Sequence, residues 1–453
     1  MTGAVRAHRA GRPGGPGGPG GPGGPGGPGG PGGPGGEESV RLGLRPNLAQ
    51  FVLLAVVNFF VGGMVGLERT VTPLVGTEQF HLGAIAVAAF VVVFGMAKAV
   101  TNAVGGLVTA RFSRRAILIA GWVIGLPVPF MLAWGPGWGW VIAANVLLGV
   151  NQGLTWSMTV NMKIDLIGPA RRGFALGINE TAGYLGVAVT ALATGYLASG
   201  FGLRPAPELL GVGYAVAGLA LSVLAVRDTG AWTRAEARQH PRPAGPPPPA
   251  REIIALVSWK DRTLAAVSQA GLVSNLNDGL VWVVLPVLLA SHGVSVTGIG
   301  YVKALYPFMW AAGMIATGHL ADRIGRKPPI IAGMLIQAAG LAVITAGIAQ
   351  ALAAGLAGAF LLGAGTALAY PTLLAAVTDA THPAWRASAL GIYRFWRDAG
   401  YAIGALIGGI TAALASLDAA IGVAAILTAA SGLIAWALMR ETRPRQRRGL
   451  PTG

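Results

Sequence analysis

The chain has 453 residues, of which 53% are hydrophobic and 11% charged, and its formal net charge is +16. Soluble domains carry roughly 25% charged residues, so this composition predicts that most of the chain lies in lipid. Without cysteine the chain has no disulfide framework and no thiolate metal site. It shows neither a Walker-type phosphate loop nor an HExxH metal motif, so we expect no cofactor, no ATP-driven pump and no enzyme.

Residues 1–47 form the first segment, a tail with Pro-Gly-Gly triplets at residues 13–36. Glycine at every third position is also typical of collagen, but the run is short and lacks the variety of collagen triplets. We therefore expect a disordered spacer on the cytoplasmic side, without a cleavable signal peptide.

Apolar spans follow, and each is long enough for the roughly 20 residues that cross a bilayer as a helix. The first six lie at about 48–75, 80–105, 115–134, 138–163, 171–199 and 208–226, and six more lie at about 263–290, 296–320, 328–349, 351–378, 385–414 and 417–438. A polar, Pro-rich stretch separates the two sets. The expected domains are a six-helix bundle at 48–226, a cytoplasmic linker at 227–262, a second bundle at 263–440 and a basic tail at 441–453.

The two sets of spans repeat one another. The basic segment GLVTARFSRR at 106–115 has its counterpart 212 positions later, within GHLADRIGRKP at 318–328. LLGVNQGLTW at 147–156 aligns with LLGAGTALAY at 361–370, and ALGI recurs at 175–178 and 389–392, both at an offset of 214. A nearly constant offset over several elements indicates a duplication that produces two six-helix bundles.

The basic segments resemble the loops between the second and third and between the eighth and ninth helices of the major facilitator superfamily. That pattern reads Gly-x-x-x-Asp-Arg-x-Gly-Arg-Arg/Lys. The second copy matches it at Gly318, Asp322, Arg323, Gly325, Arg326 and Lys327. The first copy keeps Gly106, Arg111, Arg114 and Arg115, with Ala110 and Ser113 in place of Asp and Gly.

The resemblance implies an all-α membrane protein with twelve transmembrane helices in two six-helix bundles related by pseudo-two-fold symmetry. It also implies a cytoplasmic gate in which the loop arginine pairs with an acid of the fourth helix of each bundle. The expected pairs are Arg114 with Asp165 and Arg326 with Asp379. The gate residues carried over are Gly106, Arg111, Arg114, Asp165, Gly318, Asp322, Arg323, Gly325, Arg326 and Asp379.

Lys and Arg gather in alternate loops and in both tails, as the positive-inside rule describes. We therefore expect a multi-pass protein of the cell membrane with both termini and the central linker in the cytoplasm. Basic patches that bind nucleic acid would lie on one face of a soluble domain, so no nucleic-acid partner is expected.

Charged side chains inside spans are costly and mark functional sites. The proton-coupling candidates are Asp278, Glu180 and Glu68, with Asp278 and Glu180 the freer to titrate. The substrate or counter-charge candidates are Arg394, Arg397, Asp398, Lys98, Asn151, Gln152 and Asn275.

Three of these positions carry specific expectations. Lys98 lies at a depth that suits a contact with Asp398, although Arg394 is an alternative partner four residues away on the same helix. Glu68 and Arg69 are adjacent and point about 100° apart, so they cannot share a partner. They form either an interfacial pair or an outer gate or proton site. The deeper Trp residues at 156 and 310 are expected in packing or lipid-facing roles.

The predicted function is secondary active transport of a small polar or charged solute by alternating access, coupled to protons. The expected partners are a small-molecule substrate, protons and the lipid bilayer, with the protein as a monomer. An uncoupled facilitator and a non-transporting sensor or scaffold of the same fold are the alternatives. The fifth span does not show the Gly-Pro signature of the superfamily's drug–proton antiporters.

Overall fold

Long helices make up the structure, a computed structural model that describes residues 41–168, 172–233, 248–382 and 385–443. Within helices, the side chains of residues 103–111, 172–174, 315, 318–319, 322 and 387 lie outside this description. Strands are absent from the described part of the chain. Residues 40–453 form one unit.

The N-terminal half begins with η1 (Arg45–Asn47) and continues as α1 (Leu48–Thr70), α2 (Thr72–Leu74) and a π-helical turn, η2 (Val75–Gln79). The next span is α3 (Ala84–Arg111). Two helices share the third span, α4 (Arg114–Gly125) and α5 (Val128–Trp134), with a break at Pro127. The half is completed by α6 (Trp138–Ile167), α7 (Arg172–Phe201) and α8 (Leu209–Leu224).

The C-terminal half begins with the short α10 (Ala250–Ala255) and η4 (Leu256–Lys260), inside the segment that the sequence predicts as a linker. Six long helices follow. They are α11 (Arg262–Ser291), α12 (Val296–Ile324), α13 (Lys327–Ala346), α14 (Ala351–Ala380), which follows η5 (Ile348–Gln350), α15 (Arg386–Leu414) and α16 (Leu417–Leu438).

Eight of the described helical segments are long and apolar enough to cross a membrane. The other crossings are α6, α12 and α15, which carry much of the polar chemistry described below, and α8, which is apolar but has only 16 residues. Counted over the described helices, the two halves then contribute six crossings each. The predicted boundary between the halves, at 227–262, remains a prediction.

Side-chain caps fix where several helices begin. Ser113, Asp261, Ser295 and Ser416 each accept a hydrogen bond from the backbone N–H three residues later, at the starts of α4, α11, α12 and α16. Such caps satisfy N–H groups that the helix itself leaves unpaired.

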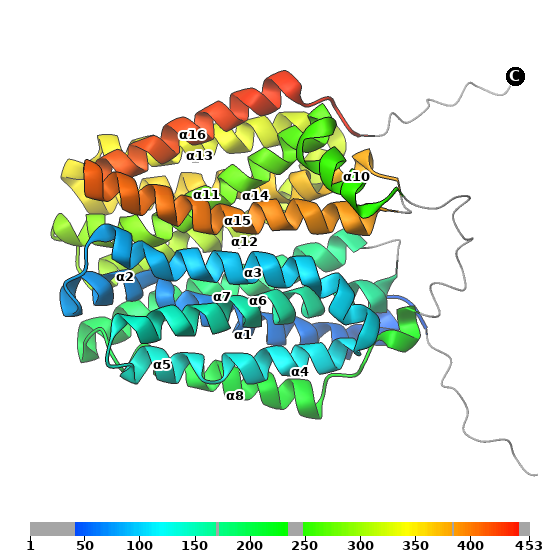
Figure 1. Cartoon of the computed structure of the whole chain (residues 1–453), viewed down its shortest axis with the longest axis horizontal. Helices are drawn as coiled ribbons and strands as arrows, with labels where there is room; N and C mark the ends of the chain where they lie inside the picture. The colour runs from blue at the N-terminus through cyan, green and yellow to red at the C-terminus, as the bar shows by residue number, and fades with distance from the viewer. Residues whose placement is uncertain (1–40, 169–171, 234–247, 383–384, 444–453) are drawn as a thin grey trace, which may run out of the picture. The chain divides into compact units, whose positions relative to one another are not determined.

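Two helix pairs join the halves, since α3 packs along α15 and α7 packs along α12. Figure 1 shows α3 running beside α15. Glycine allows the close approach of α7 and α12, because a Cβ atom on Gly195 would lie 3.0 Å from the Cα atom of Gly300. Small residues have this role where membrane helices meet. The interface between the halves therefore follows these two pairs, and the buried charges lie along it.

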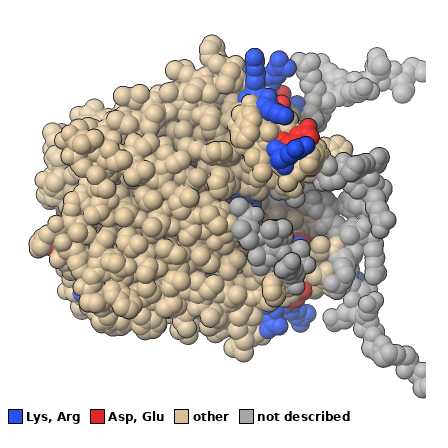
Figure 2. All heavy atoms as spheres, viewed as in Figure 1, with Lys and Arg blue, Asp and Glu red and all other residues tan. Residues whose placement is uncertain are grey.

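The ends of the helices differ in charge. On the face in Figure 2, Lys and Arg of the described residues gather at one end, and the rest of that face is almost free of charge. We call this end, where α3, α6, α12 and α14 finish, the basic end. The other end, where α1 and α11 finish, is called the opposite end.

Candidate functional site

One ion pair crosses between the halves near the opposite end. Both terminal nitrogens of Arg69, on α1, donate to the two carboxylate oxygens of Asp278, on α11. The Arg69 guanidinium also lies 4.1 Å from the ring centroid of Trp282. The side chains of Arg69 and Asp278 are 5% and 2% exposed, so water cannot replace either partner.

Glu68 faces a different neighbour from Arg69, as the helix geometry predicts. Its Oε1 accepts a hydrogen bond of 3.2 Å from Nδ2 of Asn145, within the N-terminal half. Among the described residues its Oε2 has no hydrogen-bond partner, although Glu68 is fully buried. This burial does not fit an interfacial side chain, and the outer-gate or proton-site hypothesis remains a prediction.

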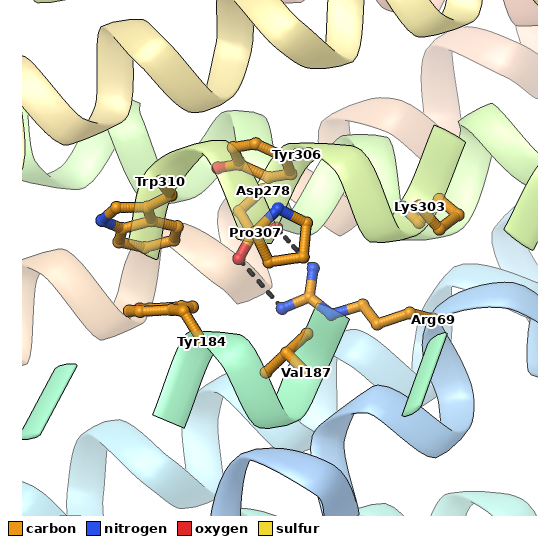
Figure 3. A pocket seen from close by; sticks show the side chains of 8 residues that line it. All are labelled: Arg69, Tyr184, Val187, Asp278, Lys303, Tyr306, Pro307 and Trp310. Atoms are coloured by element: carbon orange, nitrogen blue, oxygen red, sulfur yellow. Dashed lines mark hydrogen bonds and ion pairs between the residues drawn. The ribbon is translucent and has the colours of Figure 1, made fainter. Parts of the chain in front are cut away.

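A small cavity lies between the halves at this level. Figure 3 shows Arg69 reaching Asp278 beside Pro307, with Tyr184 and Trp310 stacked at one side. The cavity volume is about 10 Å³, which is room for about one water molecule. The halves are therefore closed around this point, and a solute needs them to separate. The lining is Arg69, Tyr184, Val187, Asp278, Lys303, Tyr306, Pro307 and Trp310.

A second group of charges lies nearer the basic end, where α15 meets α3. Nη1 of Arg397 donates to Oδ1 of Asp398 at 3.3 Å, and Nζ of Lys98 lies 4.0 Å from the same oxygen. Nδ2 of Asn102 donates to the other oxygen of Asp398. The predicted contact between Lys98 and Asp398 is thus present, whereas the other cation at Asp398 is Arg397 and not Arg394.

Glu180, on α7, joins the halves through hydrogen bonds. Its Oε1 accepts from Nε1 of Trp156 at 2.8 Å, within the N-terminal half. Its Oε2 accepts from the hydroxyl of Tyr370 on α14, in the C-terminal half, at 3.2 Å. No cation forms an ion pair with this buried carboxylate among the described residues.

Asp278 requires a correction. The sequence hypothesis treats Asp278 as free to bind a proton and Asp398 as the neutralised acid. In the structure Asp278 has the two-point contact with Arg69, while Asp398 shares two cations at longer distances. In the state described here a proton on Asp278 would leave Arg69 buried without its counter-charge, so Asp278 can take a proton only when the two halves have parted, and its role in coupling remains a prediction.

Four other predicted residues do not join this cluster. Asn151 donates to the backbone carbonyl of Gly121 and Gln152 to that of Val61, so both amides bond inside the N-terminal half. Asn275 is buried, with its Nδ2 unpaired among the described residues. Arg394 is half-buried and has no ion pair in the described chain. These contacts support packing roles for Asn151 and Gln152.

Both predicted ion pairs at the basic end are present. Nε of Arg114 lies 2.8 Å from Oδ2 of Asp165, and Nε of Arg326 donates to Oδ2 of Asp379 at 2.8 Å. Each pair stays within its own half. Whether either pair acts as a gate remains a prediction. The surroundings of four other predicted gate residues are not described: Gly106, Arg111, Gly318 and Asp322. Arg323 is exposed.

An acid from the segment after each half's last helix reaches the same loops. Glu441 accepts from the backbone N–H groups of Arg326 at 2.7 Å and Lys327 at 3.1 Å, at the start of α13. Asp228 accepts from the N–H of Arg115 at 3.3 Å, near the start of α4. The sequence analysis missed both acids. The signal was the recurrence of Arg-Asp-Thr at 227–229 as Arg-Glu-Thr at 440–442.

The aromatic side chains at the centre were also missed. Four aromatic side chains lie between the halves and contact the charged residues: Trp156, Tyr184, Trp310 and Tyr370. The sequence analysis expects only packing or lipid-facing roles for the two tryptophans. The sequence analysis also does not single out Lys163, which is fully buried and donates to Oδ1 of Asn179 at 2.6 Å. Sequence alone does not tell which face of a helix meets the other half.

Comparisons with known proteins agree with this architecture. The chain is 25% identical over 362 residues to an uncharacterized MFS-type transporter, STM4428, of Salmonella typhimurium, covering 76% of this chain and 85% of that protein. It is 33% identical over 177 residues to the class C tetracycline resistance protein of Escherichia coli, covering 38% of this chain and 43% of that protein.

The fold is that of the nucleoside transporter NupG, whose crystal structure aligns with a TM-score of 0.69 at 14% identity, covering 86% of this chain and 98% of that one. The family model described as "Major Facilitator Superfamily" matches residues 51–270 and again residues 267–453, once for each half. The predicted fold class, twelve transmembrane helices in two related six-helix bundles, is confirmed. The chain is a multi-pass membrane transporter that belongs to the Major Facilitator Superfamily.

Proposed function

We propose that this transporter moves a small polar or charged organic solute by alternating access and couples that movement to protons at Glu180. The solute binds between the halves, at the level of Arg397 and the aromatic side chains. The pair formed by Arg69 and Asp278 closes the opposite end in the state described here. Opening that end requires this pair to part, because its members belong to different halves.

The observation that carries the coupling proposal is the pair of donors at Glu180. Trp156 holds one carboxylate oxygen from the same half, whereas Tyr370 holds the other from across the interface. When one half rotates against the other, the first donor stays and the second moves away. The two orientations thus offer this carboxylate different surroundings, as coupling of a proton to alternating access requires.

The orientation in the membrane follows from charge. Basic loops face the cytoplasm in membrane proteins, and Lys and Arg gather at the basic end (Figure 2). We infer that the basic end is cytoplasmic, that both termini lie there and that the opposite end faces outward. Reporter fusions after residues 240 and 440 test this orientation, and an external signal from either contradicts it.

The coupling test uses purified protein in lipid vesicles with a radiolabelled solute identified by an uptake screen. Glu180→Gln keeps the size and hydrogen-bonding capacity of the side chain but cannot carry a proton. We expect it to lose accumulation driven by a pH gradient while exchange of labelled for unlabelled solute continues. Glu78→Gln, at an exposed acid, is the matched control. Accumulation by Glu180→Gln at the wild-type level contradicts the proposal.

Glu68 is the second proton candidate, because it is buried with one oxygen unpaired among the described residues. Glu68→Gln is compared in the same vesicles. Loss of gradient-driven accumulation in Glu68→Gln, with Glu180→Gln unaffected, would move the coupling site to the N-terminal half near the opposite end. Equilibration of the solute by wild type without accumulation under a pH gradient, unchanged in both variants, would instead favour an uncoupled facilitator.

A further inference from the structure

An aromatic stack spans the interface between the halves. The ring centroids of Tyr184, on α7, and Trp310, on α12, lie 3.5 Å apart with the planes 26° from parallel. Tyr306 stacks on the far side of this group at 5.9 Å from Trp310, and Tyr370 meets the Trp310 ring edge-on at 5.5 Å. Trp156 meets Tyr184 edge-on at 5.4 Å. The centre of the interface is thus lined by the faces and edges of five rings.

The stack must open during the transport cycle. Tyr184 and Trp310 come from different halves and border the cavity that now holds only about one water molecule. Separation of the halves at this level exposes one broad ring face from each side. Aromatic faces stack favourably on other aromatic rings, so a flat ring is the shape that fits between them.

Cations surround the stack. The Arg397 guanidinium lies 4.2 Å from the ring centroid of Tyr370, and its Nη2 donates to the hydroxyl of Tyr184 at 3.0 Å. Lys98 lies 5.3–5.8 Å from three ring centroids, and its nearest carboxylate is that of Asp398. Arg397 and Lys98 therefore share one acid, Asp398, among the described residues.

Two further donors line the same cavity, at opposite sides of it (Figure 3). Lys303 lines the cavity, and its ammonium donates to the backbone carbonyl of Val281 without an ion pair among the described residues. Nε1 of Trp310 is buried and has no acceptor in the described chain. A buried donor without an acceptor is costly, and a carboxylate would supply the acceptor that is missing. Arginine is also suited to two-point binding of a carboxylate.

We propose that the solute is a planar aromatic monocarboxylate, with its ring between Tyr184 and Trp310 and its carboxylate at Arg397. This rests on the proposed function, since it assigns the solute of the same central site. Binding of such an anion together with a proton adds no net charge to a site in which Arg397 and Lys98 share one acid and Lys303 has no ion pair among the described residues.

The test is calorimetric binding to the purified full chain, without any gradient, using four probes. They are 2-naphthoate, its saturated analogue decahydronaphthalene-2-carboxylate, 2-naphthamide and 2-naphthylmethylamine. Compared with 2-naphthoate, the saturated acid lacks the aromatic rings, the amide lacks the charge, and the amine carries a positive charge instead of a negative one. We expect 2-naphthoate to bind at least tenfold more tightly than each of the other three. Equal binding of the saturated acid or tighter binding of the amine overturns the proposal, as does absence of 2-naphthoate binding.

Variants locate the binding site. Trp310→Leu removes the aromatic face and Trp310→Phe restores one, so we expect tenfold weaker 2-naphthoate binding in the first and less than threefold in the second. Arg397→Gln should abolish the preference for the acid over the amide. Trp436→Leu, at an exposed tryptophan of α16, is the control for loss of any tryptophan. Equal binding by Trp310→Leu and wild type overturns the assignment.

Failure here is distinguishable from failure of the proposed function. If another class of solute accumulates with a pH gradient and Glu180→Gln abolishes that accumulation, the function stands and the aromatic anion is wrong. If 2-naphthoate binds as predicted but never crosses the vesicle membrane, the site binds planar aromatic monocarboxylates, but they are not the transported solute.

Discussion

The two ends of the transporter are held by ion pairs of different kinds. At the opposite end, Arg69 and Asp278 join one half to the other. At the basic end, the pairs of Arg114 with Asp165 and Arg326 with Asp379 each remain inside one half. When one half rocks against the other as a unit, only a pair that crosses the interface has to break. From this difference we propose that the pair of Arg69 with Asp278 closes the opposite end and that the internal pairs support the shape of each half.

The largest effect is expected from Asp278→Asn. Removing one partner of a buried ion pair costs roughly 3–5 kcal/mol, because the remaining charge stays desolvated. We expect a large drop in the thermal unfolding temperature in detergent and loss of transport. Replacing both partners, Arg69→Met with Asp278→Leu, should recover most of the stability, because no lone charge is left. If Asp278→Asn alone is as stable as the double variant, the ion pair does not hold the halves together.

A smaller effect is expected at the internal pairs. The Arg326 and Asp379 side chains are 12% and 17% exposed, so water partly replaces a lost partner. Asp379→Asn should cost about 1.5–3 kcal/mol, the range for hydrogen bonds to charged groups. Asp165→Asn should behave in the same way, and neither should alter the spacing between halves at the opposite end. A change in that spacing equal to the one in Asp278→Asn would erase the distinction between crossing and internal pairs.

The two basic loops allow a finer comparison, at Glu441. The C-terminal loop has Gly325 at φ +101°, and a Cβ atom there would collide with Oε2 of Glu441. Burial acts to raise the pKa of Glu441, but the backbone N–H groups of Arg326, Arg443 and Lys327 outweigh it and hold the pKa below the ordinary value of 4.5. The carboxylate thus stabilises the loop above that value and ceases to do so as pH falls through its lowered pKa.

We therefore expect Glu441→Gln to unfold at a lower temperature than wild type at pH 7, with the gap closing as the pH falls through the lowered pKa of Glu441, below 4.5. Gly325→Ala should lose the same contact, but part of its loss should persist at low pH, because alanine is strained at φ +101°. A gap that is constant between pH 7 and pH 3.5 would show that the Glu441 charge does not support the loop.

The smallest effect is expected in the N-terminal loop. Ser113 stands where the other loop has Gly325, and its hydroxyl caps α4 by accepting from the N–H of Ala116 at 3.2 Å. Asp228 adds a longer bond of 3.3 Å. Ser113→Ala should cost about 1 kcal/mol, the usual value of an N-cap. The difference in melting temperature between this variant and wild type should be the same at every pH. A loss larger than that of Asp165→Asn would reverse the predicted order.

The parts of the site that the sequence predicts are those set by one helix or by the duplication. Arg114 with Asp165 and Arg326 with Asp379 follow from matched positions in the two halves. Lys98 with Asp398 follows from depth along two helices, at about 1.5 Å per residue. Each of these inferences combines position along the chain or a helix axis with what the superfamily resemblance implies about which helices meet.

The parts that the sequence does not predict depend on how the halves dock. Asp278 meets Arg69 only because α1 and α11 present those faces to one another, and rotation of either helix would separate them. The stack of Tyr184 on Trp310 has the same origin. By contrast, Glu441 was predictable in principle, because the repeated tripeptides at 227–229 and 440–442 are visible in the chain.

The most direct test of the crossing pair is a distance between the halves at the opposite end. The chain has no cysteine, so two introduced cysteines are the only labelling sites. Glu78→Cys and His292→Cys place spin labels on exposed residues of the two halves. We predict a short, narrow distance distribution in otherwise unchanged protein and a second, longer population once Asp278→Asn is added. The same distribution with and without Asp278→Asn would contradict the claim that Arg69 and Asp278 hold this end closed.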